Sequence, residues 1–177
     1  MPPRLRRFAL TVHVASSVGW LGAVAAFLAV AVIGLTSNDA ATVRGAYLVM
    51  EPAARYVLVP LALASLLSGL IQSLGTAWGL FRHYWVLFKL LINAFATLVL
   101  LMYLQTFAAM AEVAADPSVD LDAVRKVSPV QHAALAMVLL LVTTVLAVYK
   151  PRGMTRYGQR KQGQRAERIK QPQLPVP

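Results

Sequence analysis

Two ionisable side chains, a histidine and a lysine, lie within apolar stretches of this chain, where they are suited to chemistry. His13 follows Phe8 by five residues, so a helix would place it about 7–8 Å along its axis at about 1.5 Å per residue. A neutral imidazole at that depth is a suitable axial ligand for haem iron, and the chain contains no cysteine that would compete for this role. Lys89 follows Trp85 by four residues at the start of another apolar stretch. Because ionisable groups inside a membrane span are costly, both residues are functional candidates.

Both residues also have structural interpretations, which the sequence leaves open. A single buried histidine often serves only as a hydrogen-bonded core residue, and Lys89 can extend its apolar stem toward the headgroups as an anchor. His83 lies in a short turn, close enough in depth to His13 to be a candidate second haem ligand. His132 lies near the outer end of its apolar stretch, whereas His13 lies near the inner end of the first one. The two are most of a membrane thickness apart, so we do not expect them to share an iron. The sequence has no histidine–glutamate pair or histidine cluster that would indicate zinc.

Polar and small residues recur three or four positions apart in each apolar stretch, and this spacing places them on one helix face. We expect these stripes to form the interior of a helix bundle, with the candidate interior residues Ser17, Trp20, Ser68, Gln72, Asn93 and Thr97. Such side chains form interhelical hydrogen bonds of about 0.6–2 kcal/mol each. Gly22 and Ala26 add small residues that allow close helix approach. A transport path along the polar stripes is an alternative, but no internal repeat or broken helix supports it.

The stretches that carry these residues are long enough to cross a bilayer, which takes about 20 mostly apolar residues. They cover residues 8–35, 56–81, 85–110 and 130–149. The 177-residue chain is 58% hydrophobic and 14% charged, whereas a soluble domain is about 25% charged. A soluble domain of this size would leave too much of that apolar surface in water. We therefore predict an all-α, transmembrane four-helix bundle over residues 1–150.

The charged residues predict the orientation of the bundle. If both termini are cytoplasmic, 13 basic residues and only Glu167 among the acidic ones lie on the inner side, a net charge of +12. The outer side then carries four basic and six acidic residues, a net charge of −2. Because cytoplasmic loops of membrane proteins are enriched in Lys and Arg, this asymmetry predicts an N-in, C-in topology.

Two segments outside the spans have their own signals. Residues 37–52 begin with Ser-Asn-Asp, which are good helix caps, and continue with apolar residues at helical spacing. We expect a short outer helix that lies at the membrane interface. Residues 151–177 are basic and rich in Gln, with almost no apolar periodicity, so we expect a disordered cytoplasmic tail.

The net charge of +10 does not indicate nucleic-acid binding, because the basic excess is confined to the inner flanks and the tail. A folded basic face with aromatic stacking platforms would be the signature of such binding. Basic residues next to a span set topology and attract anionic lipid, at about 1 kcal/mol per charge near the surface. We therefore expect anionic lipid, and not nucleic acid, to contact the tail.

Two segments resemble known families. Residues 10–22, LTVHVASSVGWLG, resemble the first-helix signature of small bacterial membrane proteins related to copper-resistance protein D. They also resemble HemJ-type protoporphyrinogen oxidases, in which a histidine of the first helix precedes a tryptophan and a small-residue step. Residues 85–91, WVLFKLL, are similar to the aromatic-x-x-x-Lys-Leu-Leu opening of a later HemJ helix. Over residues 8–150 the chain is most similar to a family of small multi-pass proteins of high-GC bacteria, which implies the fold and not an activity.

The HemJ resemblance implies a haem-b oxidoreductase in which His13 and Lys89 take functional positions. The first span departs from that pattern, because residues 27–34 lack the Arg and His that end the HemJ first helix. The copper relatives imply soft ligands for Cu(I), and this sequence has no Met or Cys cluster.

The sequence thus predicts an integral protein of the bacterial cytoplasmic membrane. We expect a helix-bundle scaffold or partner-binding protein, whose partner is a second copy or another membrane protein. The alternative is a b-type haem redox protein, with His13 as axial ligand, His83 as second ligand and Lys89 paired with a propionate. Catalytic residues are not identified, and enzyme activity is left open.

Overall fold

The computed structural model describes residues 2–75, 80–151 and 153–170, and these residues are helical apart from short connections and one isolated bridge between His83 and Met154. Four helical segments within these residues are long and apolar enough to cross a membrane: Pro3–Thr36, Ala40–Gly75, Tyr84–Ala115 and Leu121–Tyr149. Each predicted span falls largely within one of them, and residues 76–79 of the second predicted span lie outside the described residues. The all-α class and the four segments long and apolar enough to span a membrane are therefore confirmed.

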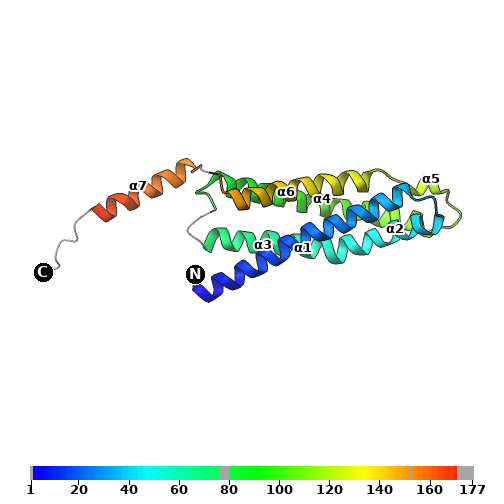
Figure 1. Cartoon of the computed structure of the whole chain (residues 1–177), viewed down its shortest axis with the longest axis horizontal. Helices are drawn as coiled ribbons and strands as arrows, with labels where there is room; N and C mark the ends of the chain where they lie inside the picture. Colours follow the sequence, from blue (N-terminus) through cyan, green and yellow to red (C-terminus); the bar gives the residue numbers. More distant parts are fainter. Residues whose placement is uncertain (1, 76–79, 152, 171–177) are drawn as a thin grey trace.

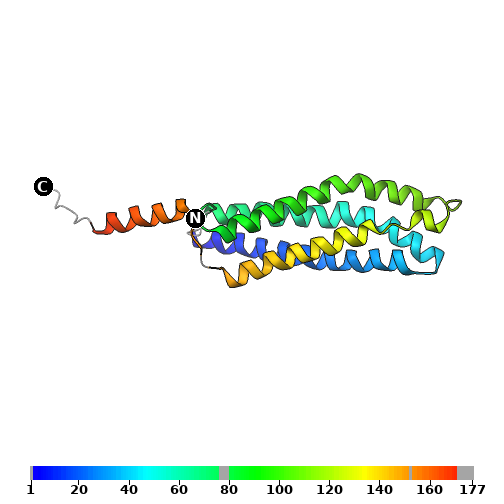
Figure 2. The ribbon, with the colours of Figure 1, turned by 90° about the horizontal axis from the view of Figure 1, so that it is seen from above.

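The segments run alternately up and down in a single bundle (Figures 1 and 2). Helix α1 (Pro3–Thr36) packs against α2 (Ala40–Ala53), α3 (Val59–Gly75) and α6 (Ser128–Tyr149). Helix α4 (Tyr84–Ala115) packs against α2, α3 and α6 and lies diagonally opposite α1. The start of α1, the α3–α4 turn and the end of α6 form one end of the bundle, here called the terminal end. Residues 37–39 and 116–127 form the loop end, which contains the short α5 (Leu121–Val124).

The second rod is one continuous helix with a wider turn in its middle. Asp39 caps α2 as the sequence indicates, because its Oδ2 accepts a hydrogen bond of 2.8 Å from the Thr42 amide. The sequence analysis expects this helix to be separate from the second span, whereas α2 continues through the π-helical turn η1 (Ala54–Leu58) into α3. Pro52 and Pro60 lie on either side of that turn and lack the N–H group that continues an α-helix. The wider turn keeps the rod continuous past both prolines.

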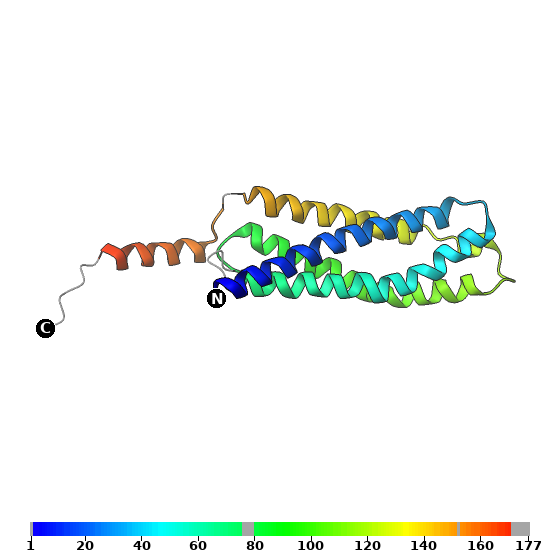
Figure 3. The same cartoon turned by 60° about the horizontal axis from the view of Figure 1, so that its bottom comes forward.

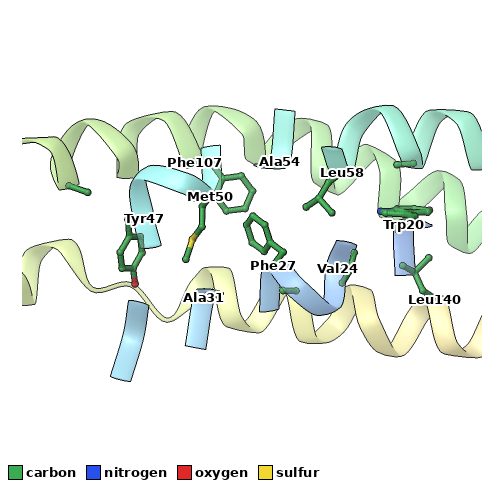
Figure 4. Packing of buried hydrophobic residues seen from close by; sticks show 14 of the residues in the cluster. Trp20, Val24, Phe27, Ala31, Tyr47, Met50, Ala54, Leu58, Phe107 and Leu140 are labelled. Atoms are coloured by element: carbon green, nitrogen blue, oxygen red, sulfur yellow. The ribbon is translucent and has the colours of Figure 1, made fainter. Parts of the chain in front are cut away.

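Large side chains at helical spacing along α1 form the centre of the bundle. Trp20, Val24, Phe27 and Ala31 are all buried, and Figure 4 shows them against residues of the other rods, among them Met50, Leu58, Phe107 and Leu140. Large apolar side chains also cover the outside of the rods, as Val18, Phe88, Leu98 and Val138 do. An apolar outer surface of this kind is suited to a lipid environment, because exposing it to water would be unfavourable.

Hydrogen bonds from arginine join the rods at the loop end. The Arg44 guanidinium of α2 donates to the carbonyl oxygens of Ala114 at 3.1 Å, Asp116 at 2.6 Å and Val119 at 2.5 Å. It thus supplies hydrogen-bond donors to carbonyl groups at and just beyond the end of α4, where the helix itself supplies none. Arg125 donates to the Ser37 carbonyl oxygen at 2.7 Å. These contacts connect both loops at this end of the bundle.

The tail contains helix α7 (Arg156–Lys170), which projects beyond the terminal end of the bundle (Figures 1 and 3). The sequence analysis expects no regular structure there, but the segment is rich in Gln, Arg and Lys, which have good helix propensity. Thr155 attaches the start of α7 to the α3–α4 turn, because its amide donates to the Arg82 carbonyl oxygen at 3.0 Å. Residues 171–177, the rest of the predicted disordered tail, lie outside the described residues.

Candidate functional site

His13 lies in the contact between α1 and α3. Its Nδ1 is 3.2 Å from the Ser65 carbonyl oxygen and 3.1 Å from the Ser68 hydroxyl oxygen. The single hydroxyl proton of Ser68 is donated to the Ala64 carbonyl oxygen at 2.5 Å. Since a carbonyl oxygen can only accept, the neutral ring carries its proton on Nδ1 and donates it to Ser65, which leaves Nε2 as the unprotonated nitrogen.

Two further hydrogen bonds extend this contact between the helices. The hydroxyl groups of Ser17 and Ser65 are 2.7 Å apart, and the side-chain amide of Gln72 donates to the Ala9 carbonyl oxygen at 2.8 Å. Ser17, Ser68 and Gln72 were all predicted to face the interior, and the structure brings them together between α1 and α3. Trp20, one turn beyond Ser17, is 2% exposed and belongs to the apolar core.

Gly69 gives the His13 ring room between α1 and α3, and it was not among the residues predicted from the sequence. A Cβ atom built on Gly69 would lie 2.9 Å from Cε1 of His13, so a side chain at this position would require the ring or the helices to shift. The signal was present in the sequence, because Ser65 and Gly69 are small residues four positions apart in the second span.

Lys89 lies on α4, near the terminal end of the bundle. It is half-buried, and α4 lies diagonally opposite α1, the helix that carries His13. Among the residues that the structure describes, none forms a hydrogen bond or an ion pair with the Lys89 ammonium group. Thr97 is buried about two turns further along the same face of α4, and its hydroxyl donates to the Asn93 carbonyl oxygen at 2.8 Å.

His83 occupies a different position from His13. It precedes α4 as the N-terminal cap residue, and its backbone pairs with Met154 at the start of the tail. Its ring centroid is 6.4 Å from that of Trp85. The pairing of His83 with His13 as two ligands of one haem stays a prediction.

A chain of aromatic rings crosses the other half of the bundle. His132 of α6 stacks on Tyr103 of α4, with ring centroids 4.2 Å apart and an interplanar angle of 29°. Tyr103 meets Phe107 edge to face at 4.9 Å, and Phe107 meets Phe27 of α1 in the same manner at 5.2 Å. The sequence indicates that His132 is too distant from His13 to share an iron with it, and the stacking of its ring on Tyr103 was not predicted. The spacing of Tyr103 and Phe107 four residues apart on one helix face was the available signal.

Apolar cavities lie between the described helices, and two of them lie near the residues discussed above. The first, of about 70 Å³, is lined by the aromatic chain together with Trp20 and residues of α4 and α6. The second, of about 240 Å³, lies between α1 and the α2–η1 segment and is lined by residues that include Ala23, Ala26, Val49 and Val57. His13, His83 and Lys89 line neither of these two cavities.

Comparisons of the chain with protein-family models, with curated proteins and with solved structures found no match. The class of the protein therefore follows from its fold alone. With four helical segments long and apolar enough to cross a membrane, it is a multi-pass helical membrane protein. The similarity to copper-resistance protein D and HemJ-type proteins stays a prediction.

Proposed function

We propose that this protein is a membrane-embedded helix bundle that binds another transmembrane helix through the face formed by α1 and the α2–η1 segment. The observation that carries the proposal is an exposed row of small residues beside a cavity. Gly22 and Ala26 are exposed on α1, and a Cβ atom on Gly22 would meet nothing within 4 Å. The 240 Å³ cavity, whose lining includes Ala26 and the exposed Val49 and Val57, lies directly beside them.

Small residues four apart allow helix backbones to approach closely in lipid, where van der Waals packing and not the hydrophobic effect drives association. The polar residues inside the bundle support a structural role as well. Ser17 and Ser65 hydrogen-bond each other, Ser68 donates to the backbone of α3, and Gln72 donates to the backbone of α1. They hold two helices of this chain together, so the face on the outside of α1 remains for a partner.

The proposal includes the orientation and the location. Basic residues are in excess at the terminal end and in the tail, whereas acidic residues gather at the loop end. By the positive-inside rule, the terminal end and α7 lie in the cytoplasm and the loop end on the outer side of a bacterial cytoplasmic membrane. In this orientation α2 forms the outer part of the second span, and the basic α7 faces the anionic lipid headgroups of the inner leaflet.

Photocrosslinking in the native membrane tests the binding face. A photoreactive residue at the exposed position of Ala25, beside Gly22, should give a product of twice the protein mass if the partner is a second copy, and of another discrete mass if it is a different protein. The same residue at Leu98, exposed on α4, is the matched control and should give neither product. Gly22→Leu should remove the product while the protein stays inserted. Crosslinks to lipid alone at both positions would contradict the proposal.

The second candidate function is haem-b binding with His13 as an axial ligand, and the tautomer of His13 favours it. A histidine that ligates a metal commonly donates its other ring N–H to a carbonyl oxygen, as Nδ1 of His13 does to Ser65. Nε2 would then bind the iron, and Lys89 would pair with a propionate. Because His13 and Lys89 line neither of the two cavities, the helices would have to separate to admit the haem. The haem would supply one-electron chemistry.

An absorption spectrum of the purified protein tests this candidate, recorded as isolated and after dithionite, from cells supplied with haem. A Soret band with reduced α and β bands, lost in His13→Ala and retained in His132→Ala, would support it. A featureless spectrum would exclude it and leave the helix-binding proposal standing.

A further inference from the structure

The aromatic cavity between α1, α4 and α6 has an almost wholly apolar wall of aromatic and aliphatic side chains. Five aromatic side chains line it: Trp20, Phe27, Phe95, Tyr103 and Phe107. The imidazole ring of His132 also belongs to the lining. Aromatic rings attract other rings in stacked or edge-to-face arrangements, worth about 0.5–1.5 kcal/mol for each pair beyond the apolar area buried.

The proton position on His132 follows from its hydrogen bond. Nδ1 is 2.8 Å from the Ser128 carbonyl oxygen, one turn earlier on α6. Because a carbonyl oxygen accepts and does not donate, Nδ1 carries the proton of the neutral ring. Nε2 is therefore an acceptor, and within the described ranges no residue donates a hydrogen bond to it. The Tyr103 hydroxyl does not donate to Nε2 of His132, because it donates its proton to Ser128 Oγ.

The cavity opens toward the lipid-facing side of the bundle. Phe95 and Leu135 line it from α4 and α6, and they are 55% and 53% exposed, so its rim belongs to the apolar perimeter. Its volume of about 70 Å³ is about half of the roughly 150 Å³ in which a buried cavity holds a whole benzene molecule. The cavity thus accommodates the edge of one ring, with the remainder of the ligand in the lipid between the two helices.

We infer that this cavity binds a lipid-soluble aromatic or quinol-type ring that carries a hydroxyl group, which enters from the bilayer and donates its hydrogen bond to Nε2 of His132. The ring would lie against Tyr103 and Phe107, and the hydroxyl would reach the acceptor at the rim. An ether or a quinone of the same shape can only accept, so it would leave Nε2 without a partner. This inference does not depend on the helix-binding face, which lies on another side of α1.

The experiment compares 2-naphthol with 2-methoxynaphthalene, an aromatic ring with a hydroxyl group and its methyl ether, on the protein in lipid nanodiscs. Equilibrium binding is followed by the fluorescence anisotropy of each probe. Ala136→Phe and Leu139→Phe fill the cavity, so the binding that remains in these variants is the background partition of each probe into lipid. Circular dichroism checks that both variants keep their helices. Because a typical hydrogen bond contributes a factor of about two to ten in affinity, wild-type protein should bind 2-naphthol more tightly by that factor.

His132→Phe is the matched variant, since it keeps an aromatic ring on Tyr103 and removes the Nε2 acceptor, together with the hydrogen bond from Nδ1 to the Ser128 carbonyl oxygen. It should bind both probes with the affinity that wild-type protein has for the ether. The inference is overturned if wild-type protein binds the two probes equally, if His132→Phe leaves the preference for the hydroxyl unchanged, or if the cavity-filling variants bind as wild type does.

Discussion

Tyr47 and Lys126 exchange two hydrogen bonds across the loop end of the bundle. The Tyr47 hydroxyl donates to the Lys126 carbonyl oxygen at 2.9 Å and accepts from the Lys126 amide nitrogen at 2.7 Å. Tyr47 is fully buried on α2, and Lys126 lies in the connection between α5 and α6. The pair therefore attaches the second rod to the start of the fourth, and it satisfies backbone groups that no helix pairs.

Tyr47→Phe tests this attachment. The substitution keeps the buried ring and removes both hydrogen bonds, so the Lys126 amide loses its partner. We expect a loss of about 1–3 kcal/mol in the free energy of unfolding, measured by denaturant titration in mixed micelles. Tyr56→Phe is the control, because Tyr56 is 72% exposed and should change the stability little. Equal stability of the two variants would show that the Tyr47 hydroxyl contributes nothing.

Arg44→Lys tests the hydrogen bonds at the end of α4. The guanidinium serves several carbonyl oxygens at once, and a single ammonium group lacks the fork geometry to do so. We expect faster amide hydrogen exchange in residues 114–124 and lower stability. The control is Arg55→Lys, because Arg55 pairs with Glu51 at an exposed position of the same rod, and exchange in residues 114–124 should stay unchanged. Unaltered exchange in Arg44→Lys would contradict this role.

Gly69→Ala tests the approach of α1 to α3. The added methyl group would lie 2.9 Å from Cε1 of His13, so the two helices must separate or His13 must rotate away from Ser65. We expect destabilisation by about 1–3 kcal/mol, the usual range for overpacking. Gly45→Ala is the matched control, since its Cβ atom would meet nothing within 4 Å and alanine favours the helix. Added His13→Ala should restore part of the lost stability, and a neutral Gly69→Ala would contradict the close approach.

Asp39 predicts a pH dependence at the loop end. Hydrogen bonds from the Thr42 side chain and amide hold the pKa of Asp39 below its ordinary value. A carboxyl group with a lowered pKa in the folded state stabilises the fold above the pKa of the unfolded chain, about 3.9, and this contribution is lost as the pH falls through the folded-state pKa.

Melting temperatures of wild type and Asp39→Ala, measured across pH, test this dependence. Wild type should melt higher at neutral pH, and the difference should shrink below about pH 3.9. Asp39→Asn keeps a capping side chain without a titrating group, so its melting temperature should not follow that decline. A difference between wild type and Asp39→Ala that is constant across this range would contradict the assignment.

Apolar length was enough to predict the spans. Three- to four-residue spacing predicts which face of a helix holds its polar groups, and Ser17, Ser68 and Gln72 lie in the α1–α3 contact of the structure. The helix cap near Asp39 was predicted from the residue types Ser-Asn-Asp, whose side chains accept hydrogen bonds from the first amides of a helix. Such signals depend on residues that are neighbours in the sequence.

Contacts between distant residues could not be predicted in this way. Pro52 suggests the end of a helix, but whether the rod continues depends on a π turn and on the packing of Tyr47 and Met50 into the core. The stacking of His132 on Tyr103 requires the relative rotation of α4 and α6, which no spacing on one helix determines. Gly69 opposite His13 likewise becomes visible only when two helices are paired.

Cysteine accessibility tests the central claim, a four-span bundle in the cytoplasmic membrane with its terminal end inside. The chain has no cysteine, so Asn38→Cys at the loop end and Gln159→Cys on α7 each supply a single reactive thiol at an exposed position. In intact spheroplasts a membrane-impermeant maleimide should label Asn38→Cys at once and Gln159→Cys only after lysis. Labelling of Gln159→Cys before lysis, with Asn38→Cys protected, would contradict the orientation, and equal labelling of both would contradict the membrane-spanning bundle itself.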